Sequence, residues 1–166
     1  MLNNVRILFI LLLFGLSSIA MGENSTRAIK DFFQNSTREN IGSNSRIFYA
    51  EDAVFEDPLV RIVGIEALVS YYEHLYENVI GINFEFQDEL IGENAASAIW
   101  IMTVRHKKLN GGESITVNGS SYFKFNPEGK VVYQRDYFDA GAMLYEQIPF
   151  LGRVVKYIKQ MAGKFI

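Results

Sequence analysis

Two aspartates, Asp57 and Asp136, are the residues of this sequence best suited to acid and base chemistry. Asp57 stands immediately before Pro58, and Asp136 follows Arg135 in a segment rich in aromatic residues. A carboxyl group in an apolar site resists ionisation, by up to about 3 to 5 pKa units when it is fully buried. Such a group can donate a proton near neutral pH, so Asp136 is a candidate general acid if it faces an apolar interior.

Each aspartate also has a structural alternative. Asp57 can form the turn that ends a strand, because aspartate side chains bond to backbone N–H groups nearby. Asp136 can accept a hydrogen bond from a backbone or hydroxyl partner, or pair with Arg61 or Arg105. Asp139 is expected to cap the helix that follows it, since aspartate is a favoured N-cap residue.

Other kinds of site find little support in the sequence. The chain has no cysteine, which excludes disulfides, thiolate metal sites and a cysteine nucleophile. His74 and His106 do not have metal-ligand spacing, and His106 is expected at a strand end or the rim of the interior. Gly111 and Gly112 form a hairpin turn rather than a phosphate loop. We therefore expect neither a metal nor an organic cofactor.

The elements that position the aspartates follow from the apolar spacing. The pattern predicts weakly helical segments over residues 27–50, a short strand at 53–57, a long amphipathic helix from residue 64, and a C-terminal helix from residue 141. Period-two alternation then predicts an antiparallel meander at about residues 82–92, 95–108, 113–126 and 129–139. Residues 99–104 are apolar on both faces, so we expect the long helix outside this strand and an enclosed space inside it. The fold class is α+β, a curved sheet wrapped on helices as a half-barrel.

Strand alternation predicts which side chains face the interior with Asp136. Counting from the turns places Asp136 in one row with Gly119 and Met102. The aromatic members can equally fill a solid core. The predicted lining is Phe55, Trp100, Met102, Ser121, Phe123, Gln134 and Phe138.

Two segments carry a family resemblance. One is the run Tyr-Ala-Glu-Asp-Ala-Val-Phe-Glu-Asp-Pro at residues 49–58 with Gly64 after it, and the other is Gly-Lys-Val at 129–131 leading to Arg-Asp-Tyr-Phe-Asp at 135–139. Over roughly residues 28–162 the chain resembles the SnoaL-like branch of the nuclear transport factor 2-like superfamily, to which ketosteroid isomerases and limonene epoxide hydrolases also belong. The resemblance implies a cone of curved sheet with an apolar cavity, without implying the reaction.

The resemblance also implies roles for single residues. Asp57 stands where ketosteroid isomerases have their general base, and Asp136 stands where limonene epoxide hydrolases have the aspartate that protonates the epoxide. The two oxyanion-hole positions of the isomerases fall on Phe33 and Ser121, which adds Phe33 to the expected lining. The water-activating Arg-x-Asp pair of the hydrolases falls on residues 102–104, which carry no charge. The chain thus keeps one carboxylate from each relative.

The first 22 residues have the features of a signal peptide. Arg6 precedes an apolar run over residues 7–19, and small residues at 20 and 22 fit a cleavage site. The run is short for a membrane span, which needs about 20 residues. We expect a secreted or periplasmic protein, or a cytoplasmic one if translation starts at Met21, with residues 23–166 forming one SnoaL-like domain.

Composition limits the partners. The 166 residues are 49% hydrophobic and carry a formal charge of −3, with no run of like charges, so nucleic-acid binding is not expected. The C-terminal helix combines an apolar stripe with Arg153, Lys156, Lys159 and Lys164. We expect it to close the mouth of the cone or to form the interface of a homodimer; the alternative is contact with an anionic membrane surface.

Three functions remain open at this point. The first is an isomerase, cyclase or hydrolase-like enzyme acting on a small apolar molecule with Asp57 as base and Asp136 as acid. The second is a non-catalytic protein that binds a lipid-sized or steroid-sized ligand in the same cavity. The third is an interaction protein with a filled core.

Overall fold

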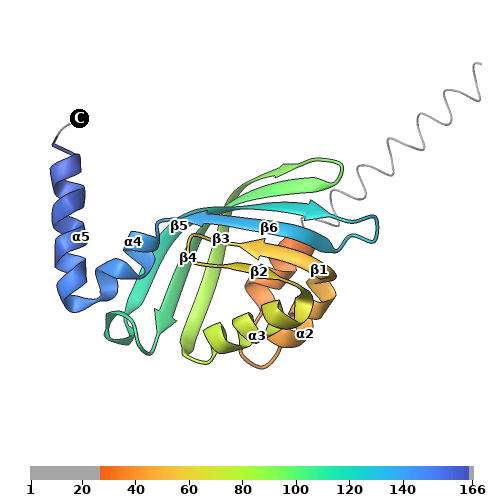
Figure 1. Ribbon diagram of the computed structural model, residues 1–166, viewed down its shortest axis with the longest axis horizontal. Helices are drawn as coiled ribbons and strands as arrows, with labels where there is room; N and C mark the ends of the chain where they lie inside the picture. The colour runs from red at the N-terminus through yellow and green to blue at the C-terminus, as the bar shows by residue number, and fades with distance from the viewer. Residues whose placement is uncertain (1–26, 165–166) are drawn as a thin grey trace, which may run out of the picture.

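The computed structural model describes residues 27–164, so the expected signal peptide lies outside the described residues (Figure 1). The described part of the chain begins with a helix over residues 27–35. The elements that follow are α2 (Ile41–Phe48), β1 (Tyr49–Glu56), β2 (Arg61–Val63), α3 (Ile65–Tyr76), β3 (Val79–Ile91), β4 (Ala95–His106), η1 (Asn110–Gly112), β5 (Ser114–Phe125), β6 (Val131–Phe138), α4 (Ala140–Met143), η2 (Tyr145–Gln147) and α5 (Pro149–Ala162).

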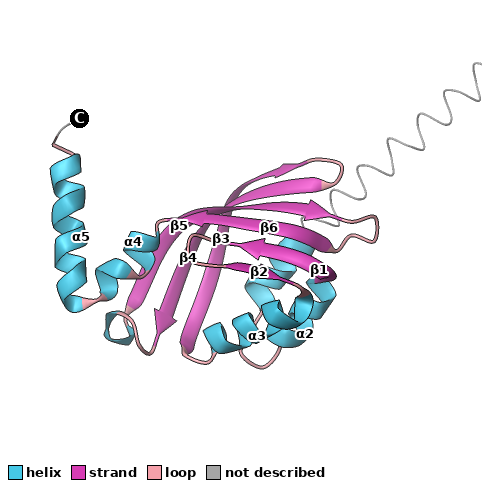
Figure 2. Ribbon diagram, viewed as in Figure 1, coloured by secondary structure: helices cyan, strands magenta, loops and turns pink. Residues whose placement is uncertain are grey.

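The strands form one six-stranded sheet in the order β2-β1-β6-β5-β4-β3. β1 and β6 run parallel, whereas every other neighbouring pair is antiparallel. Figure 2 shows the sheet curving over the N-terminal helices and α3, which lie on its concave side. The expected α+β half-barrel, with its four-strand meander β3 to β6, is confirmed.

The core lies between the concave face of the sheet and these helices. Phe32 of the first helix stacks on Phe48 of α2 with ring centroids 4.4 Å apart. Leu68 of α3 and Phe123 of β5 are fully buried in the same cluster. Burying side chains of this size stabilises the fold by about 1.5 to 3 kcal/mol each.

Gly64 makes the tight connection between β2 and α3. It has a φ of 87°, a conformation that glycine adopts without a steric penalty. Its N–H group donates a hydrogen bond to the carbonyl of Ala53 at 2.8 Å. The start of α3 is therefore tied to β1, and the tyrosines of α3 are held against the strand that leads to Asp57.

The outer face of β4 differs from the expectation. We expected α3 to cover it, but α3 lies on the concave side of the sheet, and Ile99 on the outer face is 49% exposed. Antiparallel sheets can leave one face to solvent. An apolar residue on that face therefore does not require a covering helix.

At the C-terminal end Asp139 caps α4 as predicted, accepting a hydrogen bond from the N–H group of Ala142 at 3.0 Å. α5 then projects away from the sheet (Figure 1). None of the helices described between residues 27 and 164 has the length and apolar character needed to cross a membrane.

Candidate active site

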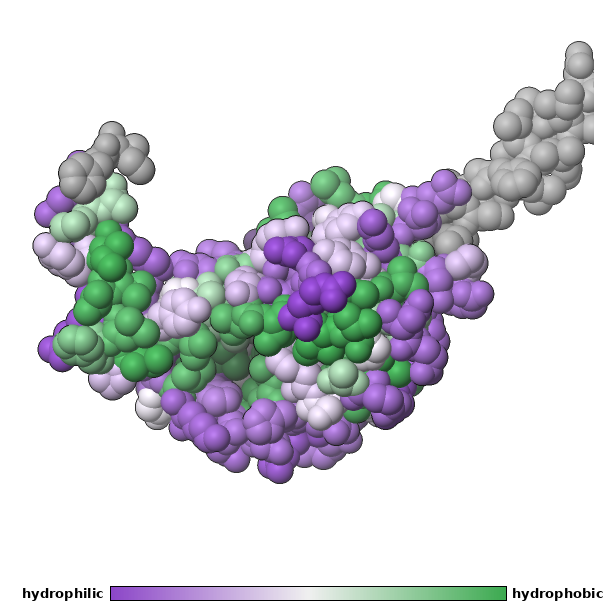
Figure 3. Space-filling view, viewed as in Figure 1, coloured by the Kyte–Doolittle hydropathy of each residue, from purple (hydrophilic) through white to green (hydrophobic). Residues whose placement is uncertain are grey.

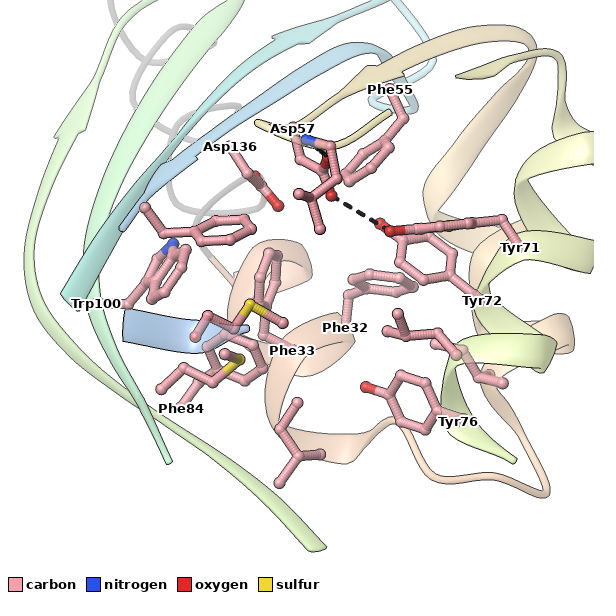
Figure 4. Close-up of a pocket in the computed structure, with 17 residues that line it drawn as sticks. Phe32, Phe33, Phe55, Asp57, Tyr71, Tyr72, Tyr76, Phe84, Trp100 and Asp136 are labelled. Atoms are coloured by element: carbon pink, nitrogen blue, oxygen red, sulfur yellow. Dashed lines mark hydrogen bonds between the residues drawn. The ribbon is translucent and has the colours of Figure 1, made fainter. Parts of the chain in front are cut away.

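A cavity of about 110 Å³ lies between the concave face of the sheet and the helices (Figure 4). Asp57 and Asp136 are the charged members of its described wall, which is otherwise aromatic and aliphatic. The lining residues are Phe32, Phe33, Ile41, Phe55, Asp57, Leu59, Tyr71, Tyr72, Leu75, Tyr76, Ile82, Phe84, Trp100, Met102, Asp136, Phe138 and Met143.

The parallel pairing of β1 and β6 brings the two carboxyl groups to one part of the cavity. Glu56 is paired with Arg135 across these strands. Asp57 follows Glu56 and Asp136 follows Arg135, and the two strands run in the same direction, so the two aspartates lie side by side. Figure 4 shows Asp136 pointing into the cavity beside Asp57.

Asp57 uses its two carboxyl oxygens differently. Oδ1 accepts hydrogen bonds from the backbone N–H groups of Leu59 at 2.7 Å and Val60 at 2.8 Å, which is the turn considered as its structural role. Oδ2 accepts a hydrogen bond from the hydroxyl of Tyr71 on α3 at 3.2 Å (Figure 4). The turn thus fixes the side chain while Oδ2 remains at the cavity.

Asp136 also has one occupied oxygen. Oδ1 accepts hydrogen bonds from Ser121 Oγ at 2.6 Å and Gln134 Nε2 at 2.8 Å. Among the residues that the structure describes, none donates a hydrogen bond to Oδ2. Burial raises the pKa of Asp136 to about 6, the bonds from Ser121 and Gln134 oppose this rise, and the charge of Asp57 adds to it.

The partners behind Ser121 and Gln134 fix the direction of both hydrogen bonds. Trp100 Nε1 donates to Ser121 Oγ at 2.9 Å, and an indole N–H can only donate, so the serine proton is left for Asp136. Tyr49 donates to Gln134 Oε1 at 2.6 Å, which turns the amide NH₂ group toward Asp136. A proton on Asp136 therefore belongs on Oδ2, the oxygen that faces the cavity.

The tyrosine hydroxyls near the aspartates act as donors. Burial raises the pKa of Tyr49 and Tyr72 well above the ordinary value. The pKa of Tyr71 is also raised, first by burial and then by the charge of Asp57. All three groups remain protonated at physiological pH.

The arginines considered as partners of Asp136 lie elsewhere. Arg61 and Arg135 both pair with Glu56 on the other face of the sheet. Arg105 Nε donates to the carbonyl of Gly112 at 3.1 Å. Asp136 therefore has hydroxyl and amide partners and no cation, as far as the described residues extend.

The predicted row across the meander is wrong. Asp136 pairs with Ser121 and not with Gly119, and Ser121 pairs with Ala98 and not with Met102. Counting from turns misplaces the partner by an even number of residues, which preserves the face of each strand but changes its neighbours. Asp136 therefore meets a hydroxyl instead of the expected thioether and glycine.

The predicted lining residues fall into two groups. Phe33, Phe55, Trp100, Met102 and Phe138 lie at the cavity. Ser121, Phe123 and Gln134 lie behind it and are fully buried. His74 is exposed on α3, and His106 is at the far end of β4.

Sequence reasoning missed ten residues of the wall, namely Phe32, Ile41, Leu59, Tyr71, Tyr72, Leu75, Tyr76, Ile82, Phe84 and Met143. Tyr71 lies beside the predicted apolar stripe of α3 rather than on it, and its hydroxyl bonds Asp57 at the end of β1, the strand to which Gly64 ties the start of α3. The doubled tyrosine at residues 71 and 72 was the available signal. Leu59 and Met143 come from connecting segments, where no periodicity indicates which way a side chain points.

Comparison with known proteins identifies the family. The sequence model described as the SnoaL-like domain matches residues 28–134. No curated protein matches the chain significantly.

Solved structures show the same fold at low sequence identity. A protein described as a SnoaL-like polyketide cyclase from Jannaschia sp. CCS1 has a TM-score of 0.64 and 12% identity, covering 75% of this chain and 91% of its own. An LEH-like epoxide hydrolase of M. tuberculosis has a TM-score of 0.62 and 18% identity, covering 81% and 96%. A protein with a ketosteroid isomerase-like fold from Catenulispora acidiphila DSM 44928, in complex with trimethylamine, has a TM-score of 0.60 and 10% identity, covering 74% and 90%.

Proposed function

Because this chain belongs to the SnoaL-like domain family, we propose that it is a cofactor-independent enzyme of the isomerase, cyclase or hydrolase type that acts on a small apolar molecule. The observation that carries the proposal is the Asp136 carboxyl, whose pKa burial raises to about 6 and whose Oδ2, which no described residue bonds, faces an apolar cavity beside Asp57. Solved relatives described as a polyketide cyclase and an epoxide hydrolase support the reaction class.

Asp136 is the proposed proton donor. With a pKa of about 6 it holds a proton in part of the molecules near neutral pH, which suits a general acid. When the proton leaves Oδ2, the negative charge that remains is stabilised by the donors Ser121 and Gln134 at Oδ1. These donors are in place before the reaction, so the charge forms without a large rearrangement.

Asp57 is the proposed base. Its turn bonds hold the carboxylate at the end of β1, and the Tyr71 hydroxyl orients Oδ2. The second lone pair of Oδ2 is the proposed acceptor of a substrate proton. A molecule seated between Oδ2 of Asp57 and Oδ2 of Asp136 can lose a proton to one group and gain one from the other.

The cavity favours a substrate smaller than a steroid. At about 110 Å³ it is near the size of an apolar protein cavity of about 150 Å³ that binds benzene, and below the usual range of about 300 to 1,000 Å³ for ligand pockets. Leu59 and Leu75 on its wall are 41% and 36% exposed and mark the opening. We therefore propose a single ring or a short chain at the two aspartates, with any longer part extending through this opening.

The test incubates the wild-type protein and the variants Asp57→Asn and Asp136→Asn with a panel of single-ring enones and small epoxides. NMR measures the conversion of each compound. Each variant should lose turnover by at least about a hundredfold, as is typical when an acid or base is removed, while remaining folded and keeping ligand-induced thermal stabilisation. Glu56→Gln is the matched control, because that carboxylate lies next to Asp57 in sequence but pairs with arginines on the other face. Full turnover in both variants would refute the mechanism.

A binding function without turnover is the second candidate. It is favoured by the hydrogen bonds that the hydroxyl groups near the aspartates already make. The Tyr71 hydroxyl donates to Asp57, and the Ser121 hydroxyl donates to Asp136. Neither hydroxyl proton is left to donate a hydrogen bond to a substrate oxygen. Thermal stabilisation of the wild-type protein by an apolar ligand, with no product from any panel member, would support this alternative.

A further inference from the structure

The apolar side chains of α5 are largely uncovered. Phe150, Tyr157 and Ile158 are 73%, 62% and 56% exposed. Leu151, Val154 and Met161 are also exposed. At 3.6 residues per turn all six fall on one side of the helix, so α5 presents a continuous apolar face that is not part of the core.

A different side of α5 attaches it to the rest of the molecule. Gly152 is buried against η2, where a Cβ atom would lie 2.2 Å from the carbonyl oxygen of Glu146. Lys159, two turns further on, forms ion pairs with Asp139 and Glu146 at 2.6 Å each. Phe150 and Tyr157 each lie two residues before these positions, about 200° around the helix. The attachment therefore turns the apolar face away from its own chain.

This attachment also leaves the cavity uncapped by α5. No residue of α5 is among the described lining residues, although Met143 of α4 is. The expectation that the C-terminal helix closes the mouth of the cone is wrong for the described chain. The apolar face of α5 therefore needs another occupant.

The charges of α5 indicate what that occupant is. The stretch from Pro149 to Lys164 contains Arg153, Lys156, Lys159 and Lys164 and no acidic residue, in a chain whose formal charge is −3. Arg153 and Lys164 fall at one border of the apolar face, where long cationic side chains can reach lipid headgroups while their stems lie on the apolar surface. A second α5 helix would bring like charges together along the same borders, with no acidic residue in α5 to pair with them.

We propose that α5 lies in the plane of an anionic membrane surface, with its apolar face at the boundary between headgroups and acyl chains. Figure 3 shows the apolar surface of α5 and the hollowed apolar area over the cavity on one face of the molecule. A membrane bound by α5 on this face therefore lies on the side from which an apolar molecule reaches the cavity. The inference stands whether the cavity catalyses a reaction or only binds.

The test takes advantage of the absence of cysteine from the chain. Tyr157→Cys is labelled with an environment-sensitive fluorophore in the full-length protein, and Ile47→Cys on α2 is the control, because Ile47 is 74% exposed on a helix elsewhere. Vesicles of phosphatidylcholine alone are compared with vesicles that also contain phosphatidylglycerol. Some vesicles carry a quencher on the acyl chains.

Membrane binding through α5 predicts a blue shift and acyl-chain quenching of the label at position 157 with the anionic vesicles only. The label at position 47 should stay in water. Arg153→Gln and Lys164→Gln should each weaken the affinity for anionic vesicles about fivefold, because both residues lie at the border of the apolar face. Lys159 is left intact because its ion pairs attach the helix.

Three results would overturn the proposal. A label at position 157 that stays in water on vesicle-bound protein would mean that another segment binds the lipid. Equal shielding of the label at position 157 by neutral and anionic vesicles would show that the basic residues of α5 do not direct the binding. Shielding without vesicles that increases with protein concentration would assign the apolar face to a second copy of the chain.

Discussion

The two carboxyl oxygens of Asp136 have different surroundings. Oδ1 receives both hydrogen bonds, from Ser121 and Gln134, and Oδ2 is left for the cavity. The donors favour the ionised form and burial favours the neutral form, so the pKa of about 6 is a balance between opposing effects. Removing one donor should shift this balance in a known direction.

Ser121→Ala should raise the pKa of Asp136 above 6, because the lost hydrogen bond is one that lowers it. A ¹³C NMR titration of the aspartate carboxyl carbons measures the change. The variant should also lose about 1 to 3 kcal/mol of unfolding free energy, since the buried Trp100 N–H group loses its acceptor. Ser120→Ala, on the opposite face of β5, is the control, and an unchanged pKa of Asp136 in Ser121→Ala would contradict this account.

At the scale of elements, β4 and β5 fit together because Gly119 has no side chain. It pairs with Trp100 across the two strands, and a Cβ atom at Gly119 would lie 2.1 Å from Trp100 Cη2. The indole ring therefore lies over the glycine, and its N–H group reaches Ser121. The position of Asp136 on the next strand depends on this packing.

Gly119→Ala should therefore lower the free energy of unfolding by about 1 to 3 kcal/mol through overpacking. Chemical denaturation followed by circular dichroism measures it. Gly81→Ala in β3 is the matched control, because a Cβ atom added at Gly81 would meet nothing within 4 Å. Equal stability of the two variants would show that Trp100 moves aside without cost.

Alternation predicted the strands and their inward faces, but not their partners. β3 to β6 lie within a few residues of the expected segments, and Asp136 faces inward as assumed. The register was wrong at both connections. The β4–β5 connection includes the helical turn η1, whose geometry is not evident from residues 107–113, and the β5–β6 pairing shifts register at an irregularity between Lys124 and Phe125. The serine opposite Asp136 was therefore placed on the correct face and assigned the wrong partner.

The candidate site was predictable only where the motifs and the strand alternation determine which side chains face inward. The two aspartates and five lining residues follow from the family resemblance and from the alternation of side chains along each strand. The Tyr71 contact with Asp57 joins residues 14 positions apart and depends on the packing of α3 against the sheet. The Tyr49 contact with Gln134 joins residues 85 positions apart and depends on the pairing of β1 with β6. Local sequence carries no signal for such contacts.

At the scale of the whole molecule, the burial of Asp136 makes folding stability depend on pH. Its pKa rises from an ordinary value of 3.8 to about 6 on folding. The folded state therefore binds more protons than the unfolded state between these values, so the contribution of Asp136 to stability is complete below pH 3.8 and is lost as the pH rises through about 6. Glu56 has the opposite sign: desolvation pushes its pKa up, but hydrogen bonds from Arg61 and Arg135 outweigh this effect and keep it below the ordinary value.

Asp136→Asn should therefore become more stable relative to the wild-type protein as the pH rises, by about 2 to 3 kcal/mol between pH 3 and pH 8. Denaturant unfolding of both proteins across this range measures the difference. Glu56→Gln should show the reverse trend, losing stability relative to wild type as the pH rises through the range where Glu56 ionises. A constant difference between Asp136→Asn and wild type would place the ionisation of Asp136 at its ordinary value.

The packing of Trp100 has a practical consequence. The indole is the only one in the chain, it forms part of the cavity wall, and one serine separates its N–H group from Asp136. Its ultraviolet emission therefore comes entirely from the site. Filling the cavity or removing the proton from Asp136 should change that emission, so occupancy and charge can be followed in the unlabelled protein before any substrate is known.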